Sequence, residues 1–311
     1  YHCVTGVQTC ALPICFGRTD SWSDLDRYHL QRNCHHLHCS PWLHGGDGRD
    51  ASVTMQLLEI DVSQFGTAEA NTEHIRSALQ RGLPELQPAL ASHDGTLVIC
   101  GSGPSLPLFI DQIKKEQENG RPLCAINGAH DFLCEHGAVP EFFLTVDPRP
   151  MPQNLKRVNS YTTYLLASRV NPETFDAVKH VKTVLWHSWS EEAECDVWRG
   201  MGKFGVGGGT TSGLRAINVG YVLGYRKFRL YGLDSCLSDD RSTKRFTGEK
   251  AGAIVDVIVG DRTFWCNHAM AQQAQDFQKL YAVMPDMTVE SFGDGLITAI
   301  LAERRKRGLR A

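Results

Sequence analysis

The chain has 311 residues, enough for one large domain or two of ordinary size. Its hydrophobic fraction of 42% and charged fraction of 22% are typical of a globular protein with a sizeable core. The net charge of -3 gives no reason to expect nucleic acid as a partner. No apolar run approaches the roughly 18 residues that a membrane span requires.

The first 54 residues differ in pattern from the rest. Cysteine and histidine crowd there, and no helical or strand period runs through the segment. Residues 1–15 resemble a translated sequencing adapter. The stretch Cys34–Cys39 (CHHLHC) holds residue types that bind zinc, but its spacing matches no usual zinc motif. We therefore expect 1–54 to be an artefact or a disordered upstream segment, with the natural start at Met55.

The remaining six cysteines are scattered singly, mostly beside apolar residues (Cys100, Cys124, Cys134, Cys195, Cys236 and Cys266). Single cysteines spread over a chain of this size indicate free thiols in a reducing compartment rather than a disulfide framework. The sequence therefore predicts a cytoplasmic protein.

From Met55 the pattern becomes regular. Residues 55–94 are predicted as a helical lead-in, with Ile75 and Leu79 at helical spacing and Asn71 or Thr72 as the cap. Strands are then expected at 97–100, 122–127, 142–147, 162–168, 182–188, 227–234 and 287–292, and helices at 106–118, 129–137, 172–178, 211–224, 268–284 and 295–306. This alternation predicts one α/β domain over 95–311, a Rossmann-like, doubly wound, mostly parallel sheet with helices on both faces.

In such sheets ligands bind at the carboxyl ends of the strands, so the residues there are the candidate site. The first group is GSGPSL, in which Gly101, Ser102, Gly103, Pro104 and Ser105 connect a buried strand to a helix. Glycines let a backbone approach a phosphate closely, and a helix amino end offers free N–H groups. The spacing matches neither a Walker A loop nor GxGxxG. A merely structural turn is the alternative.

Two further strand ends carry polar side chains. Asn127 follows one strand and can both donate to and accept from a base or ribose, although it could also simply form a turn. Asp147 follows another, with Arg149 two residues later. A carboxylate there could hold Mg²⁺ or a ribose hydroxyl, because magnesium uses one or two carboxylates together with substrate phosphates.

A glycine-rich segment gives the strongest signal. Gly207, Gly208 and Gly209 form a loop of phosphate size, and the hydroxyl residues Thr210, Thr211 and Ser212 follow at the start of an apolar helix. The next strand ends near Asp234, which returns a carboxylate to the same edge of the sheet. We expect this loop and the Gly101 corner to meet at one rim and to offer backbone amides to an anionic group.

The stretch 235–262 is charged and rich in turns, and could form a lid over that edge. His268 starts the helix that follows. It is a candidate general base, although a lone histidine is more often an ordinary polar group.

Three segments together suggest a family: VICGSGPSL, AINGAHDFLCEHGAVPEFFLTVD and GGGTTSGLRAINVGYVLGYRKFRLYGLD. They resemble the 6-hydroxymethylpterin diphosphokinase MptE-like family, a Rossmann-like group common in microbial and phage genomes, over about 95 to 295. The resemblance implies transfer of diphosphate from ATP, with Mg²⁺, to a hydroxymethyl pterin-like acceptor. Asp147, Asp234 and His268 become candidate catalytic residues, with Asp147 as the metal ligand.

The same segments are similar to bacterial sialyltransferases that use CMP-sialic acid. That resemblance implies nucleotide contacts from Gly101, Gly103, Pro104, Ser105 and Asn127, with Thr211, Ser212 and Gly213 beside them, and places His268 near the base. Ser102 and Asp147 depart from the sialyltransferase pattern. A nucleotide-binding module without turnover is a third reading. In each reading the partners are a nucleotide and, for an enzyme, a small-molecule acceptor; the oligomeric state stays open.

Overall fold

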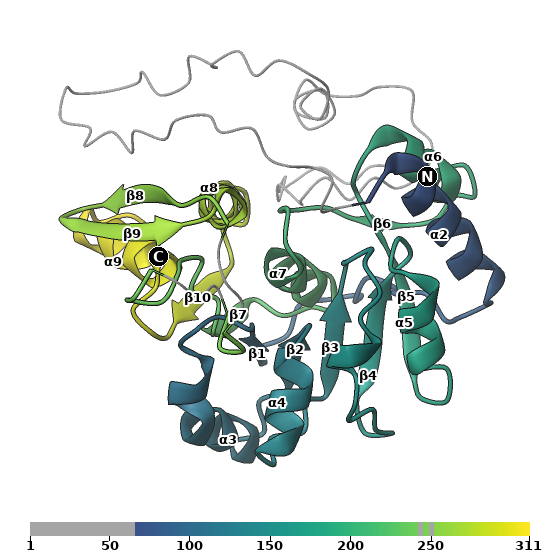
Figure 1. Cartoon of the computed structure of the whole chain (residues 1–311), viewed down its shortest axis with the longest axis horizontal. Coiled ribbons are helices and arrows are strands. Elements are labelled where there is room, and N and C mark those ends of the chain that lie inside the picture. The colour runs from purple at the N-terminus through teal and green to yellow at the C-terminus, as the bar shows by residue number, and fades with distance from the viewer. Residues whose placement is uncertain (1–65, 242–244, 249–251) are drawn as a thin grey trace, which may run out of the picture.

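The computed structural model describes residues 66–241, 245–248 and 252–311. The predicted upstream segment 1–54, with Cys34–Cys39, lies outside the described residues. An eight-stranded sheet with the order β10-β7-β1-β2-β3-β4-β5-β6 forms the centre (Figure 1). Its strands are β1 (Thr96–Cys100), β2 (Leu123–Ile126), β3 (Phe142–Thr145), β4 (Thr163–Ala167), β5 (Thr183–Ser188), β6 (Gly205–Val206), β7 (Lys227–Tyr231) and β10 (Thr288–Ser291).

The helices connect these strands. They are α2 (Ala68–Gln80), η2 (Leu106–Phe109), α3 (Ile110–Glu118), α4 (Ala129–Glu135), η3 (Pro152–Asn154), α5 (Pro172–Ala177), α6 (Glu192–Arg199), α7 (Ser212–Val222), α8 (His268–Val283) and α9 (Leu296–Lys306). A separate antiparallel hairpin consists of β8 (Val255–Val259) and β9 (Arg262–Cys266).

Every pair of neighbouring strands in the large sheet is parallel, which confirms the predicted Rossmann-like α/β class. The chain adds β1 to β6 in one direction, and α7 then carries it back to β7 on the other side of β1. The strand order therefore reverses between β1 and β7. In open parallel sheets the crevice at such a switch point is where ligands usually bind.

Strand β1 shows why the sheet is buried on both faces. Leu97 and Ile99 pack in a cluster with Leu214 of α7, whereas Val98 packs in a second cluster with Ile113 of α3. Successive side chains of a strand point to opposite faces, so a continuous apolar run requires cover on both sides. Figure 1 shows α7 on one side of the central strands and α3 and α4 on the other.

Three local expectations were wrong. The first helix is capped by Thr67, not by Asn71 or Thr72; Asn71 lies inside the helix and donates to the buried Glu194. The stretch 235–262, expected to be irregular, contributes β8. Helix α6 and the two-residue strand β6 were not predicted, because elements so short carry little periodicity.

Among the described residues, no helix is both long and apolar enough to cross a membrane. The described cysteines all have free thiols.

Candidate functional site

The predicted site residues lie along the carboxyl ends of the strands, here called the carboxyl rim: the segments 101–105, 127–128, 146–149, 207–212 and 232–235. These segments follow β1, β2, β3, β6 and β7 respectively. Helix α7 joins several of them. Ser212 in its first turn accepts a hydrogen bond from the amide of Val146 at 3.2 Å, so the amino end of α7 lies against the end of β3.

At the β1 corner the backbone amides are already engaged. Gly101 N donates to Tyr231 O and Gly103 N donates to Gly232 O, both at 2.8 Å. Ser105 N donates to a carboxylate oxygen of Asp234 at 3.0 Å. The helix that follows is the four-residue η2, not a full α-helix. These glycines therefore bring the β1 corner against the β7 corner, and their expected phosphate contacts stay a prediction.

The carboxyl group of Asp234 completes this junction. It is 6% exposed, and it accepts a second hydrogen bond from the Ser105 hydroxyl at 2.6 Å. Burial raises the pKa of Asp234 above its ordinary value, although the two hydrogen bonds from Ser105 oppose the rise. A buried carboxyl group with both oxygens occupied is well placed to fix the corner. The catalytic role suggested for it stays a prediction.

The direction of this pKa shift predicts a pH dependence. A raised folded-state pKa means that the contribution of Asp234 to stability is full below the unfolded value of about 3.8 and falls as pH rises through the folded pKa.

Asn at this position can still accept from Ser105 N and can donate to the Ser105 hydroxyl. At pH 7 we expect the free energy of unfolding of Asp234→Asn to lie within about 1 kcal/mol of wild type. We expect Asp234→Ala to lower it by about 2 kcal/mol, because the amide and hydroxyl donors of Ser105 then lose their acceptor. Urea unfolding at pH 4 and pH 7 measures both; a D234N protein as unstable as D234A would contradict the assignment.

A leucine side chain packs between the β1 corner and the first turn of α7. A Cβ at Gly101 would lie 3.0 Å from Leu233 Cδ1, and a Cβ at Gly213 would lie 2.9 Å from Leu233 Cδ2. The buried Leu233 side chain thus fills the space between the β1 corner and the start of α7. This packing counts against the expectation that the β1 corner and the glycine loop offer amides to one anionic group, and that expectation stays a prediction.

Asn127 lies on the other side of the β1 corner and has two unusual features. Its φ is 50°, in the left-handed region that few residues adopt apart from glycine and, more often than most others, asparagine. Its side-chain oxygen is buried and has no hydrogen-bond partner among the described residues. Strained backbone and unsatisfied polar atoms are both costly, and they concentrate at functional sites. Ser102 lies beside it, with its hydroxyl donating to Ile126 O at 3.2 Å.

Asp147 is paired within its own turn. Arg149 donates from Nε at 2.9 Å and from Nη2 at 2.6 Å to the two carboxylate oxygens, a two-pronged geometry that guanidinium groups favour. Within the described part of the chain, no three His, Cys, Asp or Glu side chains gather where they could hold a metal ion. With Asp147 held by Arg149 and Asp234 by Ser105, these residues do not fit a preformed magnesium site. The metal role of Asp147 stays a prediction.

The glycine loop precedes α7 and packs against it. Gly208 and Gly209 have φ of 89° and 70°, which only glycine adopts without strain, and each is closely packed against α7. Gly207 differs, because a Cβ built there meets no atom of the described residues within 4 Å. Thr210 is exposed, and Thr211 caps α7 by accepting from Leu214 N. The loop therefore has one open position next to a helix amino end.

His268 lies at the same rim as the first residue of α8, partly buried. The preceding strand brings it there, since Cys266 Sγ contacts the Ser235 carbonyl at 3.3 Å just beyond β7. Further along α8, Gln273 lies 3.3 Å from the position of a Cβ on Gly213 in α7. The amino half of α8 thus borders the first turn of α7, which is compatible with the predicted role of His268 as a base.

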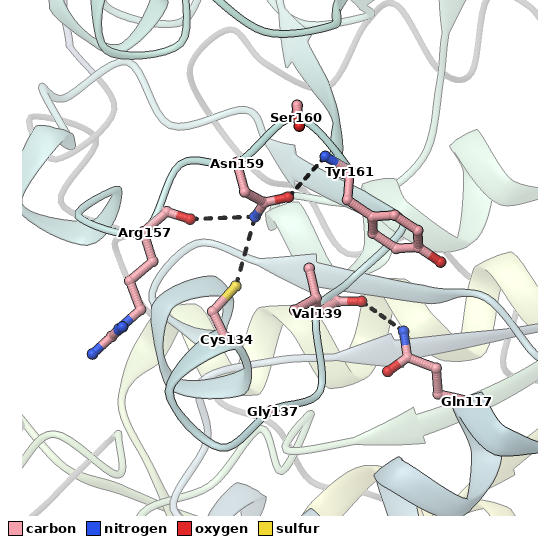
Figure 2. Close-up of a pocket in the computed structure, with 8 residues that line it drawn as sticks. All are labelled: Gln117, Cys134, Gly137, Val139, Arg157, Asn159, Ser160 and Tyr161. Atoms are coloured by element: carbon pink, nitrogen blue, oxygen red, sulfur yellow. Dashed lines mark hydrogen bonds between the residues drawn. The ribbon is translucent and has the colours of Figure 1, made fainter.

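A cavity of about 450 Å³ lies at the opposite, amino edge of the sheet. Figure 2 shows its lining, which includes Val139 ahead of β3 and Tyr161 ahead of β4. The polar lining groups are largely satisfied within the protein: Gln117 donates to Val139 O at 2.6 Å, and Asn159 accepts from the amide of Tyr161 at 3.0 Å. Because these groups are occupied and parallel sheets use their carboxyl edge, we assign the candidate site to the carboxyl rim.

Sequence reasoning missed one residue at this rim. Arg215 lies in α7 and directs its guanidinium to the carbonyls of Val206 and Trp189, at the carboxyl ends of β6 and β5. A signal was present in the sequence, since Arg215 is the only charged residue of the mostly apolar helix α7.

Comparison with known proteins adds the family. A family model described as "6-hydroxymethylpterin diphosphokinase MptE-like" matches residues 69–240, more than half of the 311 residues. The chain belongs to the MptE-like family. The match covers the carboxyl rim from the β1 corner through Asp234 and leaves His268 outside. No curated protein matches this MptE-like chain at a significant level.

Solved structures resemble the MptE-like chain in fold. The MAf glycosyltransferase from Magnetospirillum magneticum AMB-1 aligns with a TM-score of 0.57 at 17% sequence identity, over 78% of this chain and 42% of its own. This chain thus spans less than half the length of that protein. A mammalian sialyltransferase in complex with Gal-beta-1-3GalNAc-ortho-nitrophenol aligns with a TM-score of 0.37 at 11% identity, over 74% of this chain and 80% of its own. At that TM-score the likeness carries no conclusion.

Proposed function

We propose that this MptE-like protein is a nucleotide-dependent transferase whose donor lies along the carboxyl rim, and that it transfers a glycosyl group from a sugar nucleotide. The observation that carries the proposal is the state of Asn127, a strained residue with a buried, unpartnered amide oxygen at the end of β2. Such an oxygen is satisfied when it accepts from the amino group of a base or the hydroxyl of a ribose.

The choice of reaction rests on the carboxylates. Diphosphoryl transfer depends on a metal ion and positive charge around the phosphates, whereas glycosyl transfer requires a base for the acceptor hydroxyl and stabilisation of a departing phosphate. Asp147 and Asp234 are both engaged within the protein. In our proposal His268 is the base, and the amino end of α7 stabilises the departing phosphate. The fold of the MAf glycosyltransferase supports the same choice.

In this mechanism the acceptor hydroxyl loses its proton to His268 as its oxygen bonds to the anomeric carbon of the donor sugar. The bond from that carbon to the phosphate oxygen breaks, and the nucleotide leaves with the electron pair. The partial positive charge at the amino end of α7 stabilises the leaving phosphate.

Diphosphoryl transfer from ATP to a hydroxymethyl acceptor is the second candidate, and the family description supports it. It requires Arg149 to release Asp147 so that the carboxylate can share Mg²⁺ with the donor phosphates. Arg149 is 54% exposed on its side chain, so this exchange is sterically open.

Thermal shift of the full chain separates the candidates, because a ligand that binds the folded state raises Tm by mass action. We expect CMP or another nucleoside phosphate to raise Tm equally with Mg²⁺ and with EDTA. A shift by ATP that requires Mg²⁺ and disappears in Asp147→Asn would instead support the diphosphokinase. If no nucleotide shifts Tm, the protein is not a nucleotide-dependent transferase. Circular dichroism of D147N controls for folding.

A further inference from the structure

We propose that the carboxyl end of α9 is a docking surface for a membrane with anionic headgroups. The surface, here called the basic patch, consists of three exposed cations and one exposed apolar side chain: Arg305, Lys306, Arg307 and Leu309. It lies outside the candidate site, and the inference does not depend on the proposed function.

Positive charge is concentrated at this end of the helix. Between residues 303 and 310 the sequence has five cations and a single carboxylate, that of Glu303. Glu303 pairs with Arg307 at 3.0 Å and lies 3.8 Å from Lys306. In the part of the chain that the structure describes, Arg305 forms no salt bridge. Cations at a carboxyl end also stabilise the helix through its dipole, so charge alone does not indicate a partner.

The turn that ends α9 adds an apolar side chain. Gly308 has a φ of 66° and donates its amide to Arg305 O at 3.0 Å, while the amide of Leu309 donates to Arg304 O at 2.9 Å. This is the Schellman motif, in which the residue after the glycine frequently packs against an apolar side chain of the last helical turn. Here the two positions that supply that contact are Glu303 and Arg304, which are charged. Leu309 is therefore left 51% exposed beside the cations.

Two further arginines hold this turn against the rest of the protein. The guanidinium groups of Arg304 and Arg310 lie over the buried ring of Tyr281 in α8, at 5.0 and 4.8 Å from its centroid. Arg310 also donates to the backbone oxygen of Tyr281. The turn at Gly308 is thus fixed on both of its sides, and the basic patch is exposed on a supported surface.

An anionic membrane suits this combination of side chains. Its surface attracts nearby lysine and arginine, and an apolar side chain can enter the boundary between headgroups and acyl chains. Nucleic acid is the other common polyanion, but proteins that bind single strands usually stack the bases on aromatic side chains. The basic patch contains no aromatic residue. The exposed Leu309 therefore favours lipid.

The basic patch lies away from the carboxyl rim. Leu296, the first residue of α9, donates its amide to Asp234 O at 2.8 Å at that rim. The helix has 11 residues and therefore spans roughly 16 Å. Figure 1 shows α9 at the outer edge of the molecule beside β8 and β9. Contact with a membrane at the far end of α9 leaves the rim open, so changes in the patch should not alter a nucleotide-dependent rise in Tm.

Co-sedimentation of the full chain with lipid vesicles tests the inference. We expect binding to phosphatidylcholine vesicles that contain about one-third phosphatidylserine, and much weaker binding to pure phosphatidylcholine. Arg305→Glu combined with Lys306→Glu should weaken binding to the anionic vesicles by roughly tenfold or more, and Leu309→Ser should weaken it several-fold. The matched control is Lys179→Glu combined with Lys182→Glu, the same charge change at two exposed lysines elsewhere. Its affinity should equal that of wild type.

The outcomes separate a lipid surface from charges that only stabilise the helix. If R305E/K306E lowers Tm but binds the anionic vesicles as wild type does, the cations serve the helix and the inference fails. It also fails if wild type does not bind these vesicles, or if the control at Lys179 and Lys182 weakens binding equally. Fluorescence anisotropy with a single-stranded RNA tests the other polyanion. Binding to RNA that depends on Arg305 and Lys306, without binding to vesicles, would assign the patch to nucleic acid. Should R305E/K306E not fold, Leu309→Ser decides, because its side chain is exposed.

Discussion

Replacing Glu116 with alanine is expected to destabilise the protein by about 1–3 kcal/mol, the range for leaving a buried hydrogen-bond donor without its acceptor. Glu116 lies on α3 and is 3% exposed. Its carboxylate accepts from Arg121, Arg229 and Tyr231, with the tyrosine hydroxyl at 2.9 Å. Without it, two cations and a buried hydroxyl lose their shared acceptor, and α3 loses its polar link to β7.

The pH dependence gives a second measurement on Glu116. Burial alone would raise its pKa, but the hydrogen bonds from Arg121 and Tyr231 and the attraction of Arg229 lower it below the ordinary 4.5. A lowered folded-state pKa means that the stabilisation is present above about pH 4.5 and is lost as pH falls through the folded value. Urea unfolding at several pH values should show that the free energy of unfolding falls less on acidification in Glu116→Ala than in wild type. Glu118→Ala, on the exposed side of the same helix, is the control and should match wild type.

Gly103→Ala is expected to lower the free energy of unfolding by about 3 kcal/mol, the upper end of the range for adding a methyl group to a well-packed site. A Cβ there would lie 2.2 Å from Asp234 Oδ2 and 2.6 Å from the backbone oxygen of Gly232. Backbone cannot move aside as a flexible side chain can, so the β1 and β7 corners must separate. Chemical denaturation measures the loss directly.

The matched control for Gly103 is Gly252→Ala, where an added Cβ meets no atom within 4 Å in the part of the chain that the structure describes. Its stability should equal that of wild type. The comparison also distinguishes two roles for Gly103. A G103A protein with wild-type stability but lost nucleotide binding would show that Gly103 serves a ligand and not the junction of the two corners.

The periodicity of the sequence determined the fold class. The apolar run at 97–100 could only be a strand covered on both faces, and the alternation of such runs with helical segments required a parallel sheet. Strand ends could be located for the same reason, so Asn127, Asp147 and the glycine loop were placed at the carboxyl rim in advance. The family could also be inferred from the sequence, because the segments around Gly101 and Gly207 carry the motifs on which the resemblance rests.

What occupies the space between those segments depended on the tertiary structure. A glycine pattern cannot distinguish a corner that meets a ligand from one that meets another corner, and Gly101 and Gly103 turned out to face Gly232 and Asp234. Leu233 packs between Gly101 and Gly213 of α7, which depends on the pairing of β1 with β7, strands more than a hundred residues apart in the chain. The position of Arg215 was equally hidden, because the carbonyls that hold it belong to β6 and to the residue after β5, and only the folded chain brings them to α7.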